Sequence, residues 1–241
     1  MDWQIRKLNL NIDTVVPSDK KLMEKYLTGL QLLIGHKETF IKSGDYNYLS
    51  FLELYEKVEH STLLDFDRAY IQYQMAQATT YIKGCTAECG VYKGGGSVLI
   101  AKNCADKKHY AMDTFEGFPD IISDVDIHES GGFSDVSFIE VQKLFADYKN
   151  IVVLKGSFSQ SFKGIRDEIF SFVHIDADLY NSTIECCDFF YSRLSKGGIM
   201  LFDDYLVSDT PGVKKAVDMF FAKKDTFPIV LPTCQAMVFK L

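Results

Sequence analysis

The hydrophobic pattern of the chain changes its period near residue 85. From there on, short apolar runs alternate with stretches in which apolar residues recur every three or four positions, as in strands joined by helices. The predicted strands are Cys85–Cys89, His109–Asp113, Ile151–Lys155, Phe172–Asp176, Gly198–Phe202, Phe227–Leu231 and Ala236–Phe239. The predicted helices between them are Ser97–Cys104, Val136–Tyr148, Ser182–Leu194 and Val213–Lys223. The last two strands are too close together for a helical crossover and must pair antiparallel.

This alternation predicts an α/β fold, a doubly wound Rossmann-like sheet that is mostly parallel and has an antiparallel hairpin at its C-terminal edge. The first 84 residues follow a helical period instead, with apolar stripes over Lys20–Ile34 and Ser61–Lys83. We therefore expect an N-terminal helical or lid segment, residues 1–84, and a Rossmann-like domain, residues 85–241.

Composition narrows the class of protein. Hydrophobic residues make up 47% of the 241 positions and charged residues 24%, which is typical of a soluble globular chain. The net charge is −7, and lysine and arginine are scattered, which argues against a nucleic-acid partner. No apolar run approaches the roughly 20 residues of a membrane-spanning helix, and the N-terminus lacks the apolar core of a signal peptide.

The six cysteines show no paired CxxC spacing, so we expect free thiols rather than a zinc site. Together with the missing signal peptide, this predicts a cytoplasmic protein. The sequence leaves the oligomeric state open, a homo-oligomer included.

A glycine-rich turn follows the first predicted strand. Glu88 and Gly90 begin it, Gly94–Ser97 close it, and the ligand of a doubly wound sheet binds at such a turn. The spacing is not GxGxxG, so a dinucleotide fingerprint is not met. Glu88 would repel a pyrophosphate but suits an ammonium and a sulfonium, and Asp113 at the next strand end can accept hydrogen bonds from ribose hydroxyls. These features favour adenosine without phosphates; the alternative is a tight loop with a solvated acid.

Four aspartates end two neighbouring predicted strands: Asp176 and Asp178 follow one strand, and Asp203 and Asp204 follow the next. Such crowded carboxylates repel one another unless a cation neutralises them. Oxygen ligands without a nearby cysteine indicate Mg²⁺, or else Mn²⁺. We expect Asp176, Asp203 and Asp204 to be the ligands and Asp178 to be a general base. The alternative is that these acids cap helices or lie solvated in loops.

Four segments resemble the macrocin and mycinamicin O-methyltransferases (the TylF/MycF family), which also include novobiocin-type sugar methyltransferases. They are Ala87–Gly95 (AECGVYKGG), Asp113–Pro119 (DTFEGFP), Asp176–Thr183 (DADLYNST) and Gly197–Tyr205 (GGIMLFDDY). They occur in the family's order and cover roughly residues 85 to 220. Cys89 and Tyr92 depart from the usual threonine and tryptophan.

The resemblance implies a Mg²⁺-dependent transfer of methyl from S-adenosylmethionine to a sugar hydroxyl of a glycoside, polysaccharide or nucleotide sugar, as in natural-product or polysaccharide biosynthesis. It implies the same metal ligands and the same base, a Phe115–Pro119 segment that closes over the cofactor, and a Gly156-Ser157-Phe158 turn near the adenine. The expected cofactor contacts are Glu88, Gly90, Tyr92, Gly94, Gly95, Ser97, Asp113, Thr114, Phe115, Ser157, Phe158 and Asp176.

Three other functions compete with this hypothesis. A catechol or phenol O-methyltransferase is the nearest, since vicinal oxygens chelate a metal equally well. A nicotinamide-dependent oxidoreductase is opposed by the missing GxGxxG and by Glu88. A non-catalytic binding module is opposed by the acid cluster, since a silent domain gains nothing from such repulsion. His174, inside an apolar strand, is expected to be a core or edge histidine rather than a catalyst.

Overall fold

A computed structural model describes residues 46–118 and 124–241 of the chain. The chain divides into two units, Met1–Ser50 and Phe51–Leu241, and the larger unit contains every strand described below. The helix predicted over Lys20–Ile34 lies outside the described residues. Residues 51–84, which the sequence pattern assigns to an N-terminal segment, belong to the larger unit.

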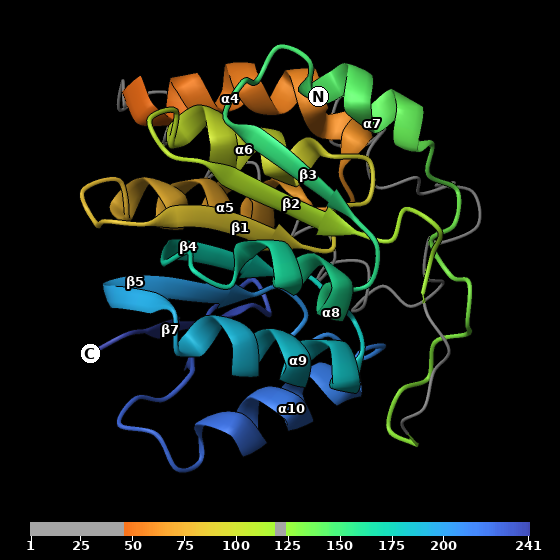
Figure 1. The fold of residues 1–241 in the computed structure, drawn as a ribbon, viewed down its shortest axis with the longest axis vertical. Coiled ribbons are helices and arrows are strands. Elements are labelled where there is room, and N and C mark those ends of the chain that lie inside the picture. The colour runs from red at the N-terminus through yellow and green to blue at the C-terminus, as the bar shows by residue number, and fades with distance from the viewer. Residues whose placement is uncertain (1–45, 119–123) are drawn as a thin grey trace, which may run out of the picture. The chain divides into compact units, whose positions relative to one another are not determined.

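The core of the larger unit is a seven-stranded sheet in the order β3-β2-β1-β4-β5-β7-β6 (Figure 1). The strands are β1 (Cys85–Cys89), β2 (His109–Asp113), β3 (Ile151–Lys155), β4 (Phe170–Ile175), β5 (Leu194–Phe202), β6 (Ile229–Val230) and β7 (Ala236–Phe239). The first five strands run parallel, and β7 is antiparallel to both β5 and β6. The predicted doubly wound sheet with an antiparallel C-terminal hairpin is confirmed.

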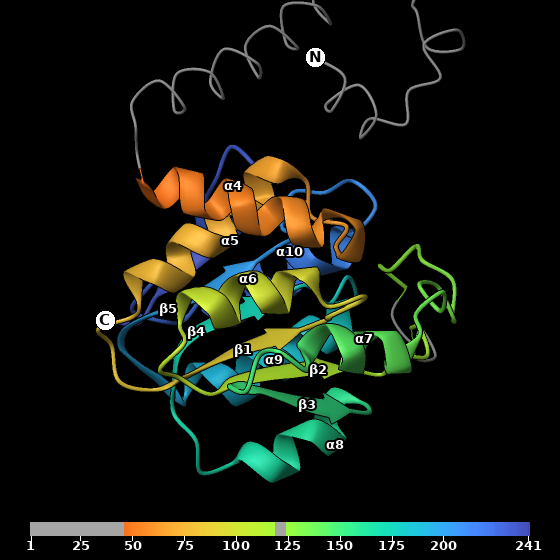
Figure 2. The ribbon, with the colours of Figure 1, turned by 90° about the horizontal axis from the view of Figure 1, so that it is seen from above.

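Helices cover both faces of this sheet (Figures 1 and 2). They are α4 (Tyr46–Val58), α5 (Phe66–Ala78), α6 (Gly95–Asn103), α7 (Phe138–Phe145), α8 (Phe158–Ser161), α9 (Tyr180–Tyr191) and α10 (Pro211–Phe221), with 3₁₀ turns η1 (Glu59–Ser61) and η2 (Phe162–Ile165). Residues of α9, α10 and η2 form one apolar core with the strands, and residues of α5 and α6 form another. Both layers bury apolar strand residues, as the near-continuous apolar runs of parallel strands require.

The element boundaries differ from the predicted ones where local chemistry overrides the apolar pattern. The helix predicted to begin at Ser61 begins at Phe66, because Asp65 caps it by accepting the backbone N–H of Arg68 at 2.9 Å. The strand predicted from Gly198 begins at Leu194, before a glycine with φ +81°, Gly197. The short α8 has no extended periodicity and was not predicted.

The helices within the described ranges are too short or too polar for a membrane-spanning segment. All six cysteines are free thiols in this part of the chain. Four of them are buried, as the apolar surroundings predict, and burial raises the pKa of Cys104 to about 11. Cys85 is partly exposed and Cys234 is exposed, so the expectation of buried thiols does not hold for these two cysteines.

Candidate functional site

A cavity of about 280 Å³ lies at the carboxyl ends of the parallel strands. The strand order reverses between β1 and β4, which makes this edge the switch point where ligands of doubly wound sheets bind. The wall of the cavity includes these sequence-predicted positions: Glu88, Gly90, Tyr92, Asp113, Thr114, Ser157, Phe158, Asp176, Asp178, Asp203 and Asp204. The topology therefore brings the glycine-rich turn and the aspartates to one place.

Gly90 joins the two halves of the cavity wall. It has φ +86°, and a Cβ at this position would lie 1.7 Å from the backbone oxygen of Asp176. The amide of Asp176 also donates to the carbonyl of Cys89 at 2.9 Å. The end of β4 thus packs directly on the backbone of the turn, and only glycine fits there.

Asp113 holds the glycine-rich turn in shape. Its Oδ2 accepts the backbone N–H groups of Val91 at 2.7 Å and Tyr92 at 3.0 Å, and its Oδ1 accepts that of Phe115 at 2.7 Å. Tyr92 and Phe115 both have positive φ, 51° and 53°, which a non-glycine residue adopts at a cost. These bonds stabilise both conformations. Thr114 Oγ1 lies 3.5 Å from Oδ1, but its hydroxyl donates at the shorter distance of 2.8 Å to the carbonyl of Gly117, so one of the roughly four lone-pair positions of the carboxylate has only this distant neighbour.

Glu88 is buried and has three protein neighbours. Its Oε1 accepts from Gln72 Nε2 at 2.8 Å and lies 3.0 Å from His174 Nδ1, while its Oε2 accepts from Ser97 Oγ at 2.5 Å. Gly96 approaches so closely that a Cβ there would lie 2.4 Å from Oε1. Glu88 is therefore a fixed acid in the cavity wall and not a solvated surface group.

Four of the expected cofactor contacts are absent from the described cavity wall. Gly94 packs against Phe145, and Gly95 lies close to the backbone of Ser61. Ser97 hydrogen-bonds Glu88, and Phe115 is buried with its ring 4.9 Å from that of Phe138. These residues support the wall from behind, although the expectation that they touch a cofactor is not tested by the structure. Of the segment expected to close over the cofactor, Gly117 and Phe118 do line the cavity, and Pro119 is outside the described residues.

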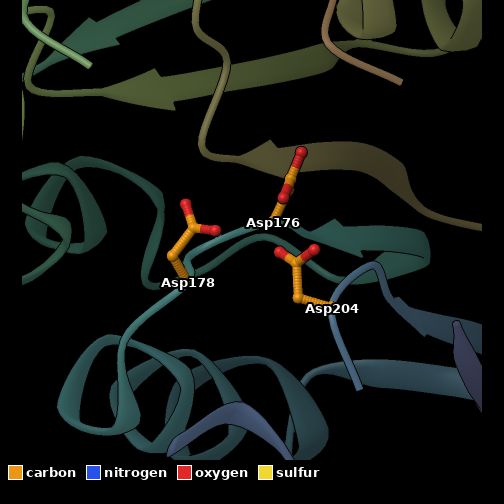
Figure 3. Close-up of side chains that lie close together, drawn as sticks. All are labelled: Asp176, Asp178 and Asp204. Atoms are coloured by element: carbon orange, nitrogen blue, oxygen red, sulfur yellow. The ribbon is translucent and has the colours of Figure 1, made fainter. Parts of the chain in front are cut away.

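Three carboxylates gather beyond the ends of β4 and β5 (Figure 3). One oxygen each of Asp176, Asp178 and Asp204 lies within 4.8 Å of the others. Asp178 has φ +56°, a left-handed conformation that aspartate tolerates better than most residues. The short Asp176-Ala177-Asp178 segment thus places two acids on one side, opposite the acid that follows β5.

The electrostatics of these carboxylates is unfavourable. Burial, followed by the charges of Asp203, Asp204 and Asp178, raises the pKa of Asp176 well above its ordinary value. Burial and Asp204 do the same to the pKa of Asp178. Full ionisation of the set therefore needs a positive charge.

Asp203, expected from the sequence to be a third metal ligand, has other partners. It forms a close ion pair with Arg68, and its Oδ1 accepts from Gln235 Nε2 at 2.7 Å. Arg68 Nη2 also donates to Asp204 Oδ1 at 2.7 Å. Burial disfavours the charge of Arg68, but Asp203 and Asp204 outweigh it and raise its pKa. The group of carboxylate oxygens within 4.8 Å of one another includes Asp178 and not Asp203, although the charge of Asp203 still acts on Asp176. That Asp203 is a metal ligand stays a prediction.

His174 connects the two groups of acids. Its Nδ1 faces Glu88 at 3.0 Å and its Nε2 lies 3.4 Å from Asp203 Oδ1. Burial lowers the pKa of this histidine, but Asp203 and Glu88 outweigh burial and raise it to about 9. It is a fully buried residue of β4, consistent with the expectation of a core histidine, and it helps to neutralise Glu88 and Asp203.

The cluster fits a divalent cation on its own geometry. Asp204 Oδ2 is buried and has no hydrogen-bond donor among the described residues. The neighbouring ligand atoms are all carboxylate oxygens, the donors that Mg²⁺ and Mn²⁺ prefer. An unpaired buried oxygen among acids with raised pKa is the arrangement that a bound cation would relieve.

Sequence reasoning missed part of the wall. Thr62, Leu64 and Arg68 line the cavity from the region around the start of α5, and Ser182 and Glu185 line it from α9. The sequence pattern did not identify Arg68 as a site residue, because a single basic residue on a helix is usually solvated. Glu185 could have been found from its place in the second turn after the aspartates.

Comparison with known proteins decides the family. The sequence profile of the macrocin-O-methyltransferase (TylF) family matches residues 68–231, about two thirds of the chain. The chain belongs to this family. The match includes every acid of the site, from Glu88 to Asp204, and Arg68 as well.

Two relatives illustrate the likeness of this TylF-family chain. Demethyldecarbamoylnovobiocin O-methyltransferase of Streptomyces niveus is 29% identical over 60% of this chain, and the match spans 60% of the relative's length. A tetracenomycin 4'-O-methyltransferase of Streptomyces olivaceus, whose name specifies a dimethoxy-rhamnosyl substrate, is 28% identical over 77% of this chain and 78% of its own length. Among solved structures, the O-methyltransferase NovP is similar with a TM-score of 0.65 and 24% identity, over 75% of this chain and 82% of that one.

Proposed function

We propose that this protein transfers the methyl group of S-adenosylmethionine to a hydroxyl group of a sugar, with a divalent cation, Mg²⁺ or Mn²⁺, held at the carboxylate cluster. One observation carries the proposal: a single cavity has fixed acids of the glycine-rich turn on one side and the Asp176, Asp178 and Asp204 carboxylates on the other. Membership of the TylF family supports the reaction type, and the name of one relative, which specifies a rhamnosyl group on tetracenomycin, supports a glycosylated natural product as acceptor.

The glycine-rich turn would hold the donor. Glu88 and Gly90 would face the methionine end, where a buried acid attracts the ammonium and sulfonium charges of the donor. Asp113, with one lone-pair position left, would accept one ribose hydroxyl. Ser157 and Phe158, which follow β3, would flank the adenine.

The carboxylate cluster would hold the cation through Asp176, Asp204 and one more acid. For that third ligand the geometry favours Asp178 over Asp203, because the oxygens of Asp203 already pair with Arg68 and Gln235. A divalent ion at such a site lowers the pKa of a coordinated hydroxyl and orients it.

The chemical step is a direct displacement at the methyl carbon. The acceptor oxygen forms a bond to that carbon, the carbon–sulfur bond breaks, and its electron pair stays on sulfur as S-adenosylhomocysteine. The hydroxyl proton leaves to a carboxylate of the site. Asp178 is the sequence-predicted base, and it lies with Asp176 and Asp204 in the wall of the same cavity.

Asp178 therefore has two candidate roles, and they predict different measurements. As the third ligand, Asp178→Asn weakens Mn²⁺ binding at least about tenfold. As a base only, the same variant binds Mn²⁺ like the parent and loses turnover by about 100-fold or more. Asp203→Asn is the matched variant. If it weakens Mn²⁺ binding more than Asp178→Asn does, Asp203 and not Asp178 is the third ligand.

Thermal unfolding tests the function itself. We expect S-adenosylhomocysteine to raise the Tm of the parent, with a further rise when Mg²⁺ is added. Methyl transfer from labelled donor to a panel of glycosides, nucleotide sugars and catechols then identifies the acceptor class. Stabilisation by NAD(H) but not by S-adenosylhomocysteine would contradict the proposal. Transfer to catechols alone would replace the sugar, and donor binding without transfer to any acceptor would indicate a binding module.

A further inference from the structure

Glu185 is an acid of the cavity that the proposed reaction does not use. It lies in the second turn of α9 and lines the cavity. Its carboxylate has no hydrogen-bond or ion-pair partner among residues 46–118 and 124–241, and burial alone raises its pKa. Glu185 is partly buried, and an acid of the cavity wall with no such partner is available to accept a hydrogen bond from a ligand.

The packing of α9 against η2 locates Glu185 within the cavity. The rings of Phe162 and Phe189 stack with centroids 4.1 Å apart and an angle of 8° between their planes. Glu185 comes four residues before Phe189, and Phe158 comes four residues before Phe162 with its ring tilted by only 13° from that of Phe162. Four residues are about one helical turn.

Glu185 and Phe158 therefore lie one turn closer to the carboxyl ends of the strands than this stacked pair. Figure 1 shows α8 and α9 side by side, both beginning at that edge of the sheet. Since both residues line the same cavity, they form its wall on the α8–α9 side.

The chemistry of this wall selects a class of ligand group. Phe158 offers an aromatic face, and the Phe158–Phe162–Phe189 rings behind it form a rigid stack that ends in Arg193, whose guanidinium lies 4.2 Å from the centre of the Phe189 ring. A carboxylate beside an aromatic face suits a flat heterocycle that carries a hydrogen-bond donor. A phosphate or a carbonyl group would be repelled there.

We propose that Glu185 selects adenine in the donor: its carboxylate accepts a hydrogen bond from the 6-amino group while the ring lies on Phe158. The inference rests on the proposed function and adds to it a residue that determines base specificity. A site built to bond an amino group rejects an analogue that lacks it, because the acid is then left unpaired.

The test compares S-adenosylhomocysteine with S-inosylhomocysteine, in which a 6-oxo group replaces the 6-amino group. Calorimetric Kd values are measured for the parent, Glu185→Gln, Glu185→Ala and Asp188→Asn. Asp188 is an exposed acid on the same helix and serves as the matched control. We expect the parent and Asp188→Asn to prefer the adenosyl ligand by at least about tenfold.

Glu185→Gln should reduce that preference at least about tenfold, because the amide can donate to the 6-oxo group. Glu185→Ala should bind both ligands with similar, weak affinity. An unchanged preference in both variants overturns the role of Glu185. The role is also overturned if the Glu185 variants change only the KM of the acceptor, because Glu185 would then contact the acceptor and not the donor.

The two proposals fail in different ways. If the parent does not bind S-adenosylhomocysteine, the proposed function and the role of Glu185 both fall. If the parent binds it and Glu185→Gln keeps the same discrimination, only the role of Glu185 falls. Thermal unfolding without ligand supplies a second measurement. Since Glu185 has no partner within the described part of the chain, Glu185→Gln should be at least as stable as the parent, whereas a lower Tm would indicate a structural role.

Discussion

The acids at the two sides of the cavity differ in how the protein satisfies them. Glu88 and Asp113, beside the glycine-rich turn, each accept several hydrogen bonds from protein donors. Asp176, Asp178 and Asp204, beyond β4 and β5, lie against one another, and one oxygen of Asp204 has no donor among the described residues. Protein donors satisfy the first group, whereas the three acids of the second share one neighbouring cation, the Arg68 guanidinium at Asp204 Oδ1, which also pairs with Asp203.

This difference indicates different uses. A satisfied acid fixes the shape of a pocket and presents what remains of its charge to a ligand. A set of unsatisfied acids costs stability in the folded protein, and such strain is retained where function requires it. Asp203 belongs with the satisfied group although it adjoins Asp204, because Arg68, Gln235 and His174 surround it.

The largest expected effect is on turnover in Asp204→Asn. The substitution removes a charge and a ligand oxygen from the cation site, which we expect to lower kcat about 1000-fold, equivalent to about 4 kcal/mol of transition-state stabilisation. Asp209→Asn, an exposed neighbour in sequence, is the control. Activity within about threefold of the parent, measured at saturating Mg²⁺, would show that the cluster is dispensable.

The next effect is on stability in Arg68→Gln. Without the guanidinium, Asp203 is a buried charge whose main cation is gone, and breaking a buried pair in this way costs about 3–5 kcal/mol. Urea unfolding measures it. Lys214→Gln breaks the exposed pair with Asp218 and should change the free energy of unfolding by less than about 1 kcal/mol. Equal losses in the two variants would mean that Asp203 does not depend on Arg68.

Asp113→Asn should affect only the donor side. An amide nitrogen cannot accept the backbone N–H groups that Asp113 binds, so the turn loosens and the Kd of S-adenosylhomocysteine should rise about tenfold. Mn²⁺ affinity should stay at the parent value. A parallel loss of Mn²⁺ binding would show that the two groups of acids are not independent.

The smallest effect is the pH dependence of Asp176→Asn without metal. The pKa of Asp176 is raised in the folded protein from its usual 3.8, so the folded state holds a proton that the unfolded state releases. The contribution of this group to stability is therefore present below pH 3.8 and is lost as pH rises through the raised pKa. Asp176→Asn cannot ionise, so the variant does not lose this stability as pH rises.

We accordingly expect metal-free Asp176→Asn to be more stable than the parent by on the order of 1 kcal/mol near neutral pH. The advantage should shrink towards pH 4, and added Mg²⁺ should reverse it by stabilising the parent. Thermal unfolding across pH 4 to 8 measures this. If the metal-free variant were less stable than the parent at every pH, the claim that Asp176 is repelled by its neighbouring carboxylates would be wrong.

Much of the fold and part of the site could be predicted from the sequence. β1 and β2 lie where the apolar runs placed them, because buried parallel strands are short and continuous. The edge strand β3 and the antiparallel β7 also have the predicted bounds. The meeting of Glu88, Asp113 and the aspartates followed from strand ends sharing one edge of the sheet. The cavity and the TylF family agree with that prediction.

The partners of each acid could not be predicted, because they depend on contacts distant in sequence. Arg68 reaches Asp203 across more than 130 positions, and His174 meets Glu88 from a neighbouring strand. Periodicity places a residue on an element but does not say which of four adjacent carboxylates a guanidinium will bind. The positive φ of Asp178, which turns it towards Asp176, also has no signature in the sequence.

The central claim is that Asp176, Asp178 and Asp204 hold one divalent cation beside the donor. Electron paramagnetic resonance of free Mn²⁺, titrated with protein, measures binding without any turnover. The account predicts one bound ion per chain in the parent and at least tenfold weaker binding in Asp176→Asn and Asp204→Asn. A parent that leaves all Mn²⁺ free, or variants that bind it as tightly as the parent, would contradict the claim.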